Sequence, residues 1–217
     1  MTERTLYTFF RSSTSFRLRI ALALKDLPYT PAFVSLPKMQ HREPDYLKLN
    51  PQGLVPALLD QGRLYTQSLA LLEYLDERYP EPPLMPAGVE QRAYVRMLSQ
   101  IIACDIHPLN NVRVLKYLRS RWKLSEQDSN EWYAHWIAEG MRALEETLCA
   151  EGRHGRFCLG DSMTMADVCL APQVFNAQRF NCDLSAFPLV SAISARVMSE
   201  PAVAAAHPSV QADSAQS

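Results

Sequence analysis

Glycine is scarce in this sequence of 217 residues, which contains only seven. So few glycines argue against a glycine-rich nucleotide-binding loop and against collagen-like or low-complexity structure. An excess of basic residues is also lacking, because 22 lysines and arginines stand against 23 aspartates and glutamates. A general nucleic-acid-binding protein usually carries such an excess, so the composition predicts no nucleic-acid partner.

Long apolar segments and paired cysteines are lacking too. The first four residues include the charged Glu3 and Arg4, and the apolar stretch after them spans only about five residues. A secretory signal needs an apolar region of about 7–15 residues, and a membrane span needs about 20. The five cysteines form no C-x-x-C pair, which argues against a zinc site and against a disulfide framework. We therefore expect no metal, no membrane association, mostly buried thiols and a cytoplasmic location.

The first 80 residues alternate between strand and helix patterns. The expected strands lie at residues 6–10, 29–36, 54–59 and 63–66, and the expected helices at 16–25 and 68–79. The first strand, helix and strand predict a parallel βαβ unit. The Asp60-Gln61-Gly62 turn then predicts an antiparallel hairpin. Together, the βαβ unit and the hairpin predict a mixed four-stranded sheet. Arg17 and Arg19 are expected to lie away from the apolar face of the first helix.

Prolines at residues 80–86 predict a stiff boundary, after which the strand signal disappears. Thr164 and Asp167 match a capping box at the start of one of the later helices. The expected helices lie at 89–121, with a bend at His107-Pro108, and at 126–150, 166–179 and 188–199. We expect an α/β domain at 1–81, a linker at 82–88, an all-helical domain at 89–203 and a disordered tail at 204–217.

Residues 11–15 are the first candidate site, because they join the first strand to the first helix. The carboxyl end of a strand is the usual ligand position in an open α/β sheet. The hydroxyls of Ser12, Ser13 and Thr14 meet the positive end of a helix dipole there, which suits an anion such as a thiolate. Plain helix capping explains the same residues. Ser68 is expected to cap the second helix in the same way.

Several segments, taken in order, resemble one family. Residues 12–22 resemble the S-S-C-x-W-R-V-R-I-A-L signature of zeta-class glutathione transferases. Residues 50–58 resemble that family's N-P-x-x-x-V-P-x-L segment, and residues 67–75 resemble its Q-S-x-A-I-x-x-Y-L helix start. The matches run from about residue 5 to about residue 190. The resemblance implies a thioredoxin-like domain followed by an all-α domain, which the pattern analysis predicts independently.

The resemblance also implies glutathione bound to the first domain. Gln67 and Ser68 would hold its γ-glutamyl end, and the Val55 backbone, beside a cis Pro56, would pair with the cysteinyl part. Gln52 would reach the glycyl end or the cysteinyl backbone. Ser13 and Thr14 would hold the sulfur as a thiolate, since helix N-termini and hydroxyl donors lower a thiol pKa.

Thr14 departs from the family signature, in which this position is usually cysteine. A hydroxyl still donates to a thiolate, so activation of glutathione survives the change. Chemistry that needs a protein thiol at this position does not survive it. The departure argues against a reductive dehalogenase of the related type.

Residues 104–113 resemble the corresponding segment of bacterial maleylpyruvate isomerases. That match implies that His107 and Asn111 approach glutathione and that Arg113 faces the substrate. Arg179 and Arg11 complete a possible set of three arginines, a residue type that binds carboxylates bidentately. Two alternatives stay open, because Arg113 fits a solvated basic face with Lys116 and Lys123, and His107 fits a hydrogen-bonded polar group at a helix bend.

The expected activity is cis–trans isomerisation of a maleyl-type dicarboxylate, maleylpyruvate or maleylacetoacetate, in aromatic-compound catabolism. In this mechanism the thiolate adds to the double bond, the single bond rotates, and elimination leaves the fumaryl product. The family implies a homodimer. A transferase that conjugates or dehalogenates small α-halo acids is the nearest alternative, and a non-enzymatic binding module is the second.

Overall fold

The computed structural model describes residues 4–216, which form two compact units. One unit holds the described residues up to Leu84 together with those from Ser199 onward. The other unit runs from Met85 to Met198. Each unit is described separately below.

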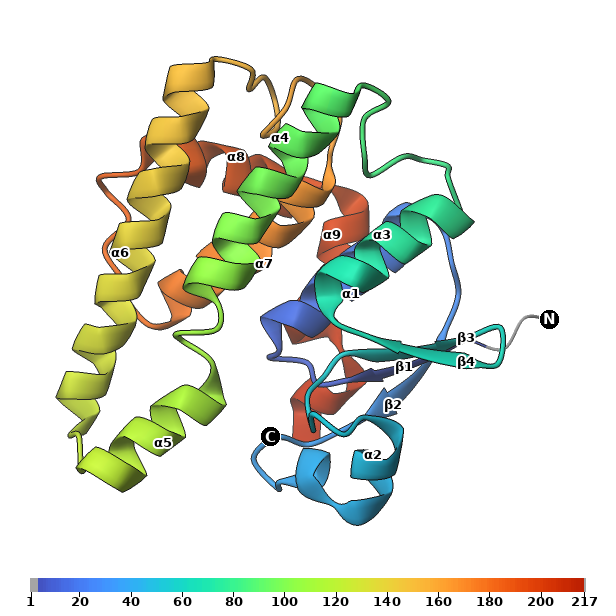
Figure 1. Cartoon of the computed structure of the whole chain (residues 1–217), viewed down its shortest axis with the longest axis vertical. Helices are drawn as coiled ribbons and strands as arrows, with labels where there is room; N and C mark the ends of the chain where they lie inside the picture. Colours follow the sequence, from blue (N-terminus) through green and yellow to red (C-terminus); the bar gives the residue numbers. More distant parts are fainter. Residues whose placement is uncertain (1–3, 217) are drawn as a thin grey trace. The chain divides into compact units, whose positions relative to one another are not determined.

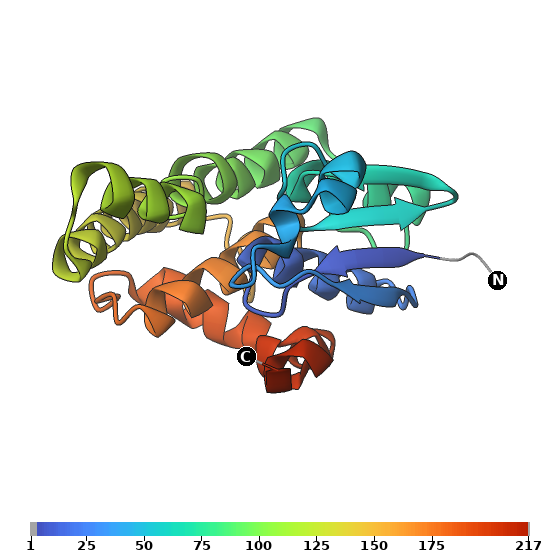
Figure 2. The ribbon, with the colours of Figure 1, turned by 90° about the horizontal axis from the view of Figure 1, so that it is seen from below.

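The first unit is built on a four-stranded mixed sheet with the order β2-β1-β3-β4 (Figure 2). Its strands are β1 (Thr5–Thr8), β2 (Thr30–Phe33), β3 (Ala57–Asp60) and β4 (Arg63–Thr66). The β1 strand pairs parallel with β2 and antiparallel with β3, which pairs antiparallel with β4. The predicted βαβ unit and hairpin are both confirmed.

Helices α1 (Ser13–Leu24) and α3 (Ser68–Arg78) pack against each other over one face of this sheet, and α2 (Pro44–Leu49) lies at the other face (Figure 1). A short 3₁₀ turn, η1 (Gln40–Arg42), precedes α2. Leu6 and Leu58 are fully buried in the sheet, and Tyr7 meets Tyr46 of α2 edge-on at 6.0 Å between ring centroids. Both faces of β1 are therefore covered.

The α1 helix is buried on nearly all sides, which the amphipathic prediction missed. Arg17 and Arg19 are 0% and 1% exposed, although the sequence pattern placed both away from the apolar face. The prediction was wrong because α1 is covered by α9 (Pro201–Ala206) as well as by α3. A helix enclosed in this way has no solvent face on which a charged side chain can lie.

The C-terminal segment differs from the expected disordered tail at 204–217. It forms α9, followed by two 3₁₀ turns, η3 (Pro208–Val210) and η4 (Ala212–Gln216). These residues belong to the sheet-containing unit, so the helical unit ends at Met198 and not at residue 203. Composition suggested disorder because alanine and serine dominate, but small side chains also allow a helix to pack closely against α1.

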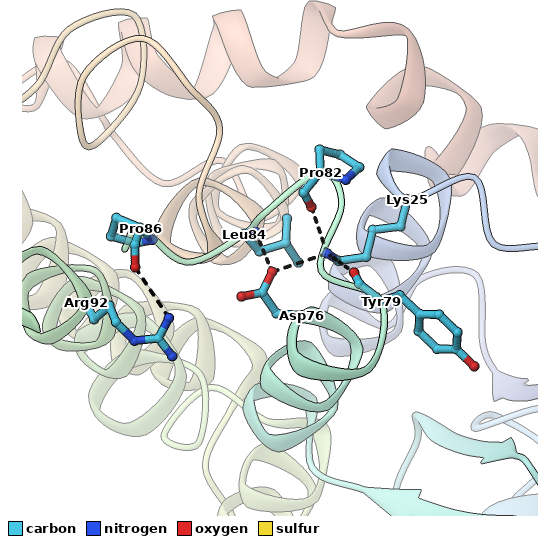
Figure 3. A network of polar contacts seen from close by, with 7 residues as sticks. All are labelled: Lys25, Asp76, Tyr79, Pro82, Leu84, Pro86 and Arg92. Atoms are coloured by element: carbon cyan, nitrogen blue, oxygen red, sulfur yellow. Dashed lines mark hydrogen bonds and ion pairs between the residues drawn. The ribbon is translucent and has the colours of Figure 1, made fainter. Parts of the chain in front are cut away.

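The buried ammonium group of Lys25 is the centre of a network of polar contacts in the first unit (Figure 3). Lys25 Nζ donates to Asp76 Oδ1 at 3.2 Å and to the carbonyls of Tyr79 and Pro82 at 2.7 Å each. Asp76 Oδ1 also accepts from the Leu84 N–H. The proline-rich segment is thereby fixed to α1 and α3 by polar contacts. Within the second unit, Arg92 donates to the Pro86 carbonyl at 3.4 Å.

The second unit is helical, as predicted. Its helices are α4 (Val89–Gln100), η2 (Ile101–Ile106, a π-helix), α5 (Val112–Trp122), α6 (Glu126–Glu151), α7 (Met165–Arg179) and α8 (Pro188–Ser199). The α7 helix packs against α4, and its residues 165–174 are all buried. The predicted long helix at 89–121 is interrupted at residues 107–111, beside the expected bend.

The predicted capping box at α7 is confirmed. Asp167 accepts from the Thr164 N–H and hydroxyl, each at 2.8 Å, and from the Cys158 N–H at 2.8 Å. The cysteine prediction is only partly correct, since Cys158 and Cys169 are buried but Cys104 and Cys149 are exposed. None of the five cysteines forms a disulfide.

Candidate functional site

A chain of hydroxyl groups marks the N-terminus of α1. Ser12 is the N-cap, and its Oγ accepts from the Ser15 N–H at 3.2 Å and lies 2.9 Å from Thr14 Oγ1. Thr14 Oγ1 donates to the Val55 carbonyl at 3.0 Å. Because the Thr14 hydroxyl has only one proton, Ser12 must donate in the contact between them. The start of α1 is thus hydrogen-bonded to the loop before β3.

That loop, residues 50–56, is held by its own polar contacts. The Leu54 carbonyl accepts from Asn50 Nδ2 at 2.8 Å and from the Tyr46 hydroxyl at 2.6 Å. Burial raises the pKa of Tyr46 to about 12, so it stays a donor at neutral pH. Val55 and Pro56 are joined by a cis peptide bond, as the family resemblance implies. The carbonyls of Leu54 and Val55 thus both accept hydrogen bonds from side-chain donors.

The start of α3 differs in detail from the expected serine cap. Gln67 is the N-cap, with φ +70° and no side-chain capping bond, and Ser68 is the first helical residue. Positive φ is uncommon for glutamine, and such strained positions cluster at functional sites. The Gln67 amide donates to Gln52 Oε1 at 2.7 Å, and both side chains are exposed. Two predicted ligand residues are thereby in direct contact.

Ser68 is connected to α1 through a buried arginine. Arg17 Nη1 donates to Ser68 Oγ at 3.1 Å, and both residues are buried. The hydrogen bond joins the interior of α1 to the first turn of α3. Ser13 is also buried, at the first position of α1. Arg11 is exposed, with its guanidinium 4.9 Å from the centre of the Phe10 ring.

His107 and Asn111 lie together in the interruption that follows the π-helix. Asn111 Oδ1 accepts from the Arg113 N–H at 3.1 Å, so its Nδ2 is the atom that faces His107 Nε2 at 3.4 Å. An amide nitrogen can only donate, so His107 Nε2 is the acceptor in this contact. Such π-helical segments often accompany functional sites. The two predicted residues are thus brought into contact.

Arg113 and Arg179 come from different helices of the same unit. Arg113 is exposed in the first turn of α5, and Lys116 and Lys123 are exposed as well, so the basic-face interpretation also fits. Arg179 is exposed in the last turn of α7, 5.1 Å from the Phe180 ring centre. Phe180 in turn stacks on Tyr133 at 4.0 Å.

The sequence analysis named Ser12 among the candidate hydroxyls but assigned it no contact with glutathione, and it did not select Arg17. Ser12 carried a signal, because it is the polar residue directly before the helix and lies in the same hydroxyl run. Arg17 carried none, since its role depends on α3 packing beside α1. Among residues 4–216, no group of three or more His, Cys, Asp or Glu side chains could hold a metal ion. No helix in that range is long and apolar enough to cross a membrane.

Comparison with known proteins bears on both units. Residues 11–78 match the glutathione S-transferase N-terminal domain, and residues 111–206 match its C-terminal domain. The maleylpyruvate isomerase of a Ralstonia species is 45% identical over 210 residues, covering 97% of this chain and 99% of that one.

Two solved structures are similarly close. One is the holo structure of a maleylpyruvate isomerase described as a zeta-class bacterial glutathione S-transferase, with a TM-score of 0.94, 45% identity and coverage of 97% and 99%. The other is a maleylacetoacetate isomerase of Methylobacterium extorquens with bound malonate and glutathione, with a TM-score of 0.93, 41% identity and coverage of 95% and 97%. The predicted fold class is confirmed. This chain belongs to the glutathione S-transferase family, with the zeta-class resemblance that its motifs indicate.

Proposed function

We propose that this protein is a glutathione-dependent enzyme that isomerises a maleyl-type dicarboxylate to its fumaryl form. The observation that carries the proposal is the paired arrangement of two helix N-termini in the first unit. The α1 terminus bears Ser12 and Thr14, and the α3 terminus bears Ser68. The Arg17–Ser68 hydrogen bond links the two helices.

The residues of the first unit fit glutathione chemically. A tripeptide with two carboxylates and a thiol needs anion sites, a backbone partner and donors near sulfur. The N-terminus of α3 suits the γ-glutamyl carboxylate, because free N–H groups and the helix dipole favour an anion there. Ser68 and Gln67 would hold that end, Val55 beside Pro56 would pair with the peptide, and Gln52 would take the remaining polar end. His107 and Asn111 of the helical unit are proposed as further glutathione contacts.

Ser13 and Thr14 are proposed to hold the sulfur as an anion. When bound, glutathione supplies a nucleophile whose reversible addition turns a double bond into a single bond that can rotate. The Thr14 hydroxyl can turn from the Val55 carbonyl toward a charged acceptor, since hydrogen bonds to ions are about twice as strong as neutral ones. Ser13, at the first position of α1, adds the helix-terminal N–H.

Arg11, Arg113 and Arg179 are proposed to bind the carboxylates of the substrate. A guanidinium stays charged at all relevant pH values and matches a carboxylate with two parallel hydrogen bonds. The same charge stabilises an enolate that develops next to a carbonyl. The malonate in the Methylobacterium structure, itself a small dicarboxylate, supports this substrate class.

The deciding experiment is an isomerase assay with maleylpyruvate and maleylacetoacetate, with and without glutathione. We expect fumaryl product to form only with glutathione, and the free thiol concentration to stay constant. Stoichiometric loss of thiol would instead identify a conjugating or dehalogenating transferase. Binding of glutathione without turnover of either substrate would favour a binding module.

The proposed role of Arg113 is tested by comparing its substitution with that of another arginine in the same helix, α5. Arg113→Leu should raise the KM for the dicarboxylate about tenfold to hundredfold, because a hydrogen bond to a charged group contributes about 1.5–3 kcal/mol. Arg121→Leu changes an exposed arginine of the same helix and should leave that KM unchanged. Equal, small effects of both variants would favour the solvated basic face. Arg179→Leu and Arg11→Leu are measured in the same assay.

We also propose a cytoplasmic homodimer that acts in aromatic-compound catabolism. The support is family membership together with the isomerase relatives. Light scattering coupled to size exclusion should give twice the chain mass, and a mass equal to one chain would contradict the dimer.

A further inference from the structure

The C-terminal segment contacts the turn that leads into α1. This turn, residues 8–12, is closed by a hydrogen bond from the Ser12 N–H to the Phe9 carbonyl at 3.0 Å. It ends at Ser12, whose hydroxyl begins the chain to Thr14. Any displacement of the turn therefore moves the hydroxyls that are proposed to face the glutathione sulfur.

Arg19 joins this turn to α9. Its Nε donates to the Ala206 carbonyl at 2.9 Å, and its Nη2 donates to the Phe10 carbonyl at 3.0 Å. Its Nη1 donates to Thr8 Oγ1 at 3.3 Å. Burial lowers the pKa of Arg19 to about 10, so the guanidinium remains charged at neutral pH. One rigid side chain thus links the end of β1 to the C-terminal segment.

Asp213 binds the backbone of the same residue, Phe10, through the neighbouring peptide group. Its Oδ2 accepts from the Phe10 N–H at 2.9 Å, a buried contact between residues 203 positions apart. The two peptide groups that flank the Phe10 Cα are therefore both held, because the Phe10 N–H donates to Asp213 and the Phe10 carbonyl accepts from Arg19. Apolar contacts are not directional, whereas an acceptor on the N–H and a donor on the C=O together determine the orientation of a backbone segment.

We propose that Asp213 and Arg19 are positioning residues for the glutathione thiol, which act by holding the turn at residues 8–12 so that Ser12 and Thr14 are correctly placed. The inference rests on the proposed function, because it assigns these residues to the thiol site. Asp213 acts through the Phe10 backbone and Ser12, and it does not itself touch glutathione. The C-terminal segment is in this view a part of the site's support.

The test compares Asp213→Ala with Ser214→Ala. Ser214 is the next residue, and its hydroxyl donates only within the segment, to the Ser209 carbonyl at 3.3 Å. The pKa of the bound glutathione thiol is read from thiolate ultraviolet absorbance against pH, and kcat and KM from the isomerase assay. Asp213→Ala should raise that pKa and lower kcat at neutral pH by about tenfold or more, the scale of a misplaced catalytic group. Ser214→Ala should match the wild type in both measurements.

A conservative variant, Asp213→Asn, tests whether the effect of Asp213→Ala comes from the lost acceptor for the Phe10 N–H. Asp213→Asn keeps an oxygen that can accept from the Phe10 N–H, so it should restore most of kcat and most of the thiol pKa. The inference is overturned if Asp213→Ala leaves both quantities at their wild-type values. It is equally overturned if kcat falls while the thiol pKa stays unchanged, because the loss would then reflect stability alone.

A measurement on the wild-type protein covers the case in which Asp213→Ala fails to fold. Amide hydrogen exchange should show that glutathione protects residues 9–14 and residues 205–215 together. Protection confined to residues 9–14 would overturn the inference. If the wild-type protein binds glutathione and lowers its thiol pKa but isomerises neither substrate, the proposed isomerase function is wrong and the positioning role still stands. If the Asp213→Ala variant isomerises the substrate at the wild-type rate, the positioning role is wrong and the proposed function still stands.

Discussion

At the residue scale, the central feature of the candidate site is the hydrogen bonding of the Thr14 hydroxyl. Thr14 donates a hydrogen bond to the Val55 carbonyl and accepts one from Ser12, so the three groups form an ordered series. Ser13 lies between them in sequence, yet it is only 4% exposed, whereas Thr14 is partly exposed. Thr14 is therefore the better placed of the two side chains to meet an incoming ligand.

Thr14→Val is the corresponding test, because valine keeps the shape and removes the hydroxyl. We expect the pKa of the bound glutathione thiol to rise and kcat at neutral pH to fall about tenfold to hundredfold, the worth of one hydrogen bond to a charged group. Ser13→Ala should cause a smaller fall, since its side chain is buried. Absorbance titration of the thiolate and steady-state kinetics measure both. A larger effect at Ser13 would reverse the assignment.

At the element scale, two helices begin with the same capping box in different surroundings. Ser125 and Asp128 begin α6 at the surface, and Thr164 and Asp167 begin α7 in the interior. Burial raises the pKa of Asp167, although several donors oppose the shift. Hydrogen bonds from Ser125 lower the pKa of Asp128. We therefore expect the same local motif to contribute more to the free energy of unfolding at α7 than at α6.

Asp167→Ala should lower the free energy of unfolding by about 3 kcal/mol, because it leaves the Thr164 and Cys158 N–H groups buried without an acceptor. Asp128→Ala is the matched control, and its loss should be distinctly smaller because water replaces the exposed carboxylate. Urea unfolding at neutral pH compares the two. Equal losses would show that the local cap, and not burial, determines the cost.

At the scale of the whole molecule, the chain returns to its first unit after the helical one. His207 belongs to this returning segment and meets the Phe16 ring edge-on at 5.9 Å between centroids. Partial burial lowers the pKa of His207, and the nearby Arg19 charge lowers it further. The protonated form is therefore disfavoured in the folded protein.

This shift predicts a stability that depends on pH. Above the ordinary histidine pKa of 6.5 the ring is neutral in the folded and the unfolded chain, so the contribution of His207 is complete. As the pH falls below 6.5 the unfolded chain takes up the proton first, and stability is lost until the folded pKa is passed. The free energy of unfolding of His207→Asn should fall less than that of the wild type between pH 7 and pH 5. Parallel curves in urea titrations would contradict the prediction.

The sequence by itself determined the elements and the candidate motifs. Periodicity located the strands and most helices, because alternation and helical spacing are local properties. The run from Ser12 to Thr14, the Val55-Pro56 step and the Gln67-Ser68 helix start were identifiable because each is a short contiguous signal. The Thr164–Asp167 cap was predictable for the same reason.

Only the tertiary structure decided which polar groups are buried and what they contact. Arg17 and Arg19 look like surface residues until α3 and α9 cover their helix. The contact between Asp213 and Phe10 joins residues that no local pattern relates. The returning segment, taken for a disordered tail, is ordered because it packs on α1 and is held by these long-range hydrogen bonds. Such contacts depend on where distant segments meet, and composition and periodicity carry no information about that.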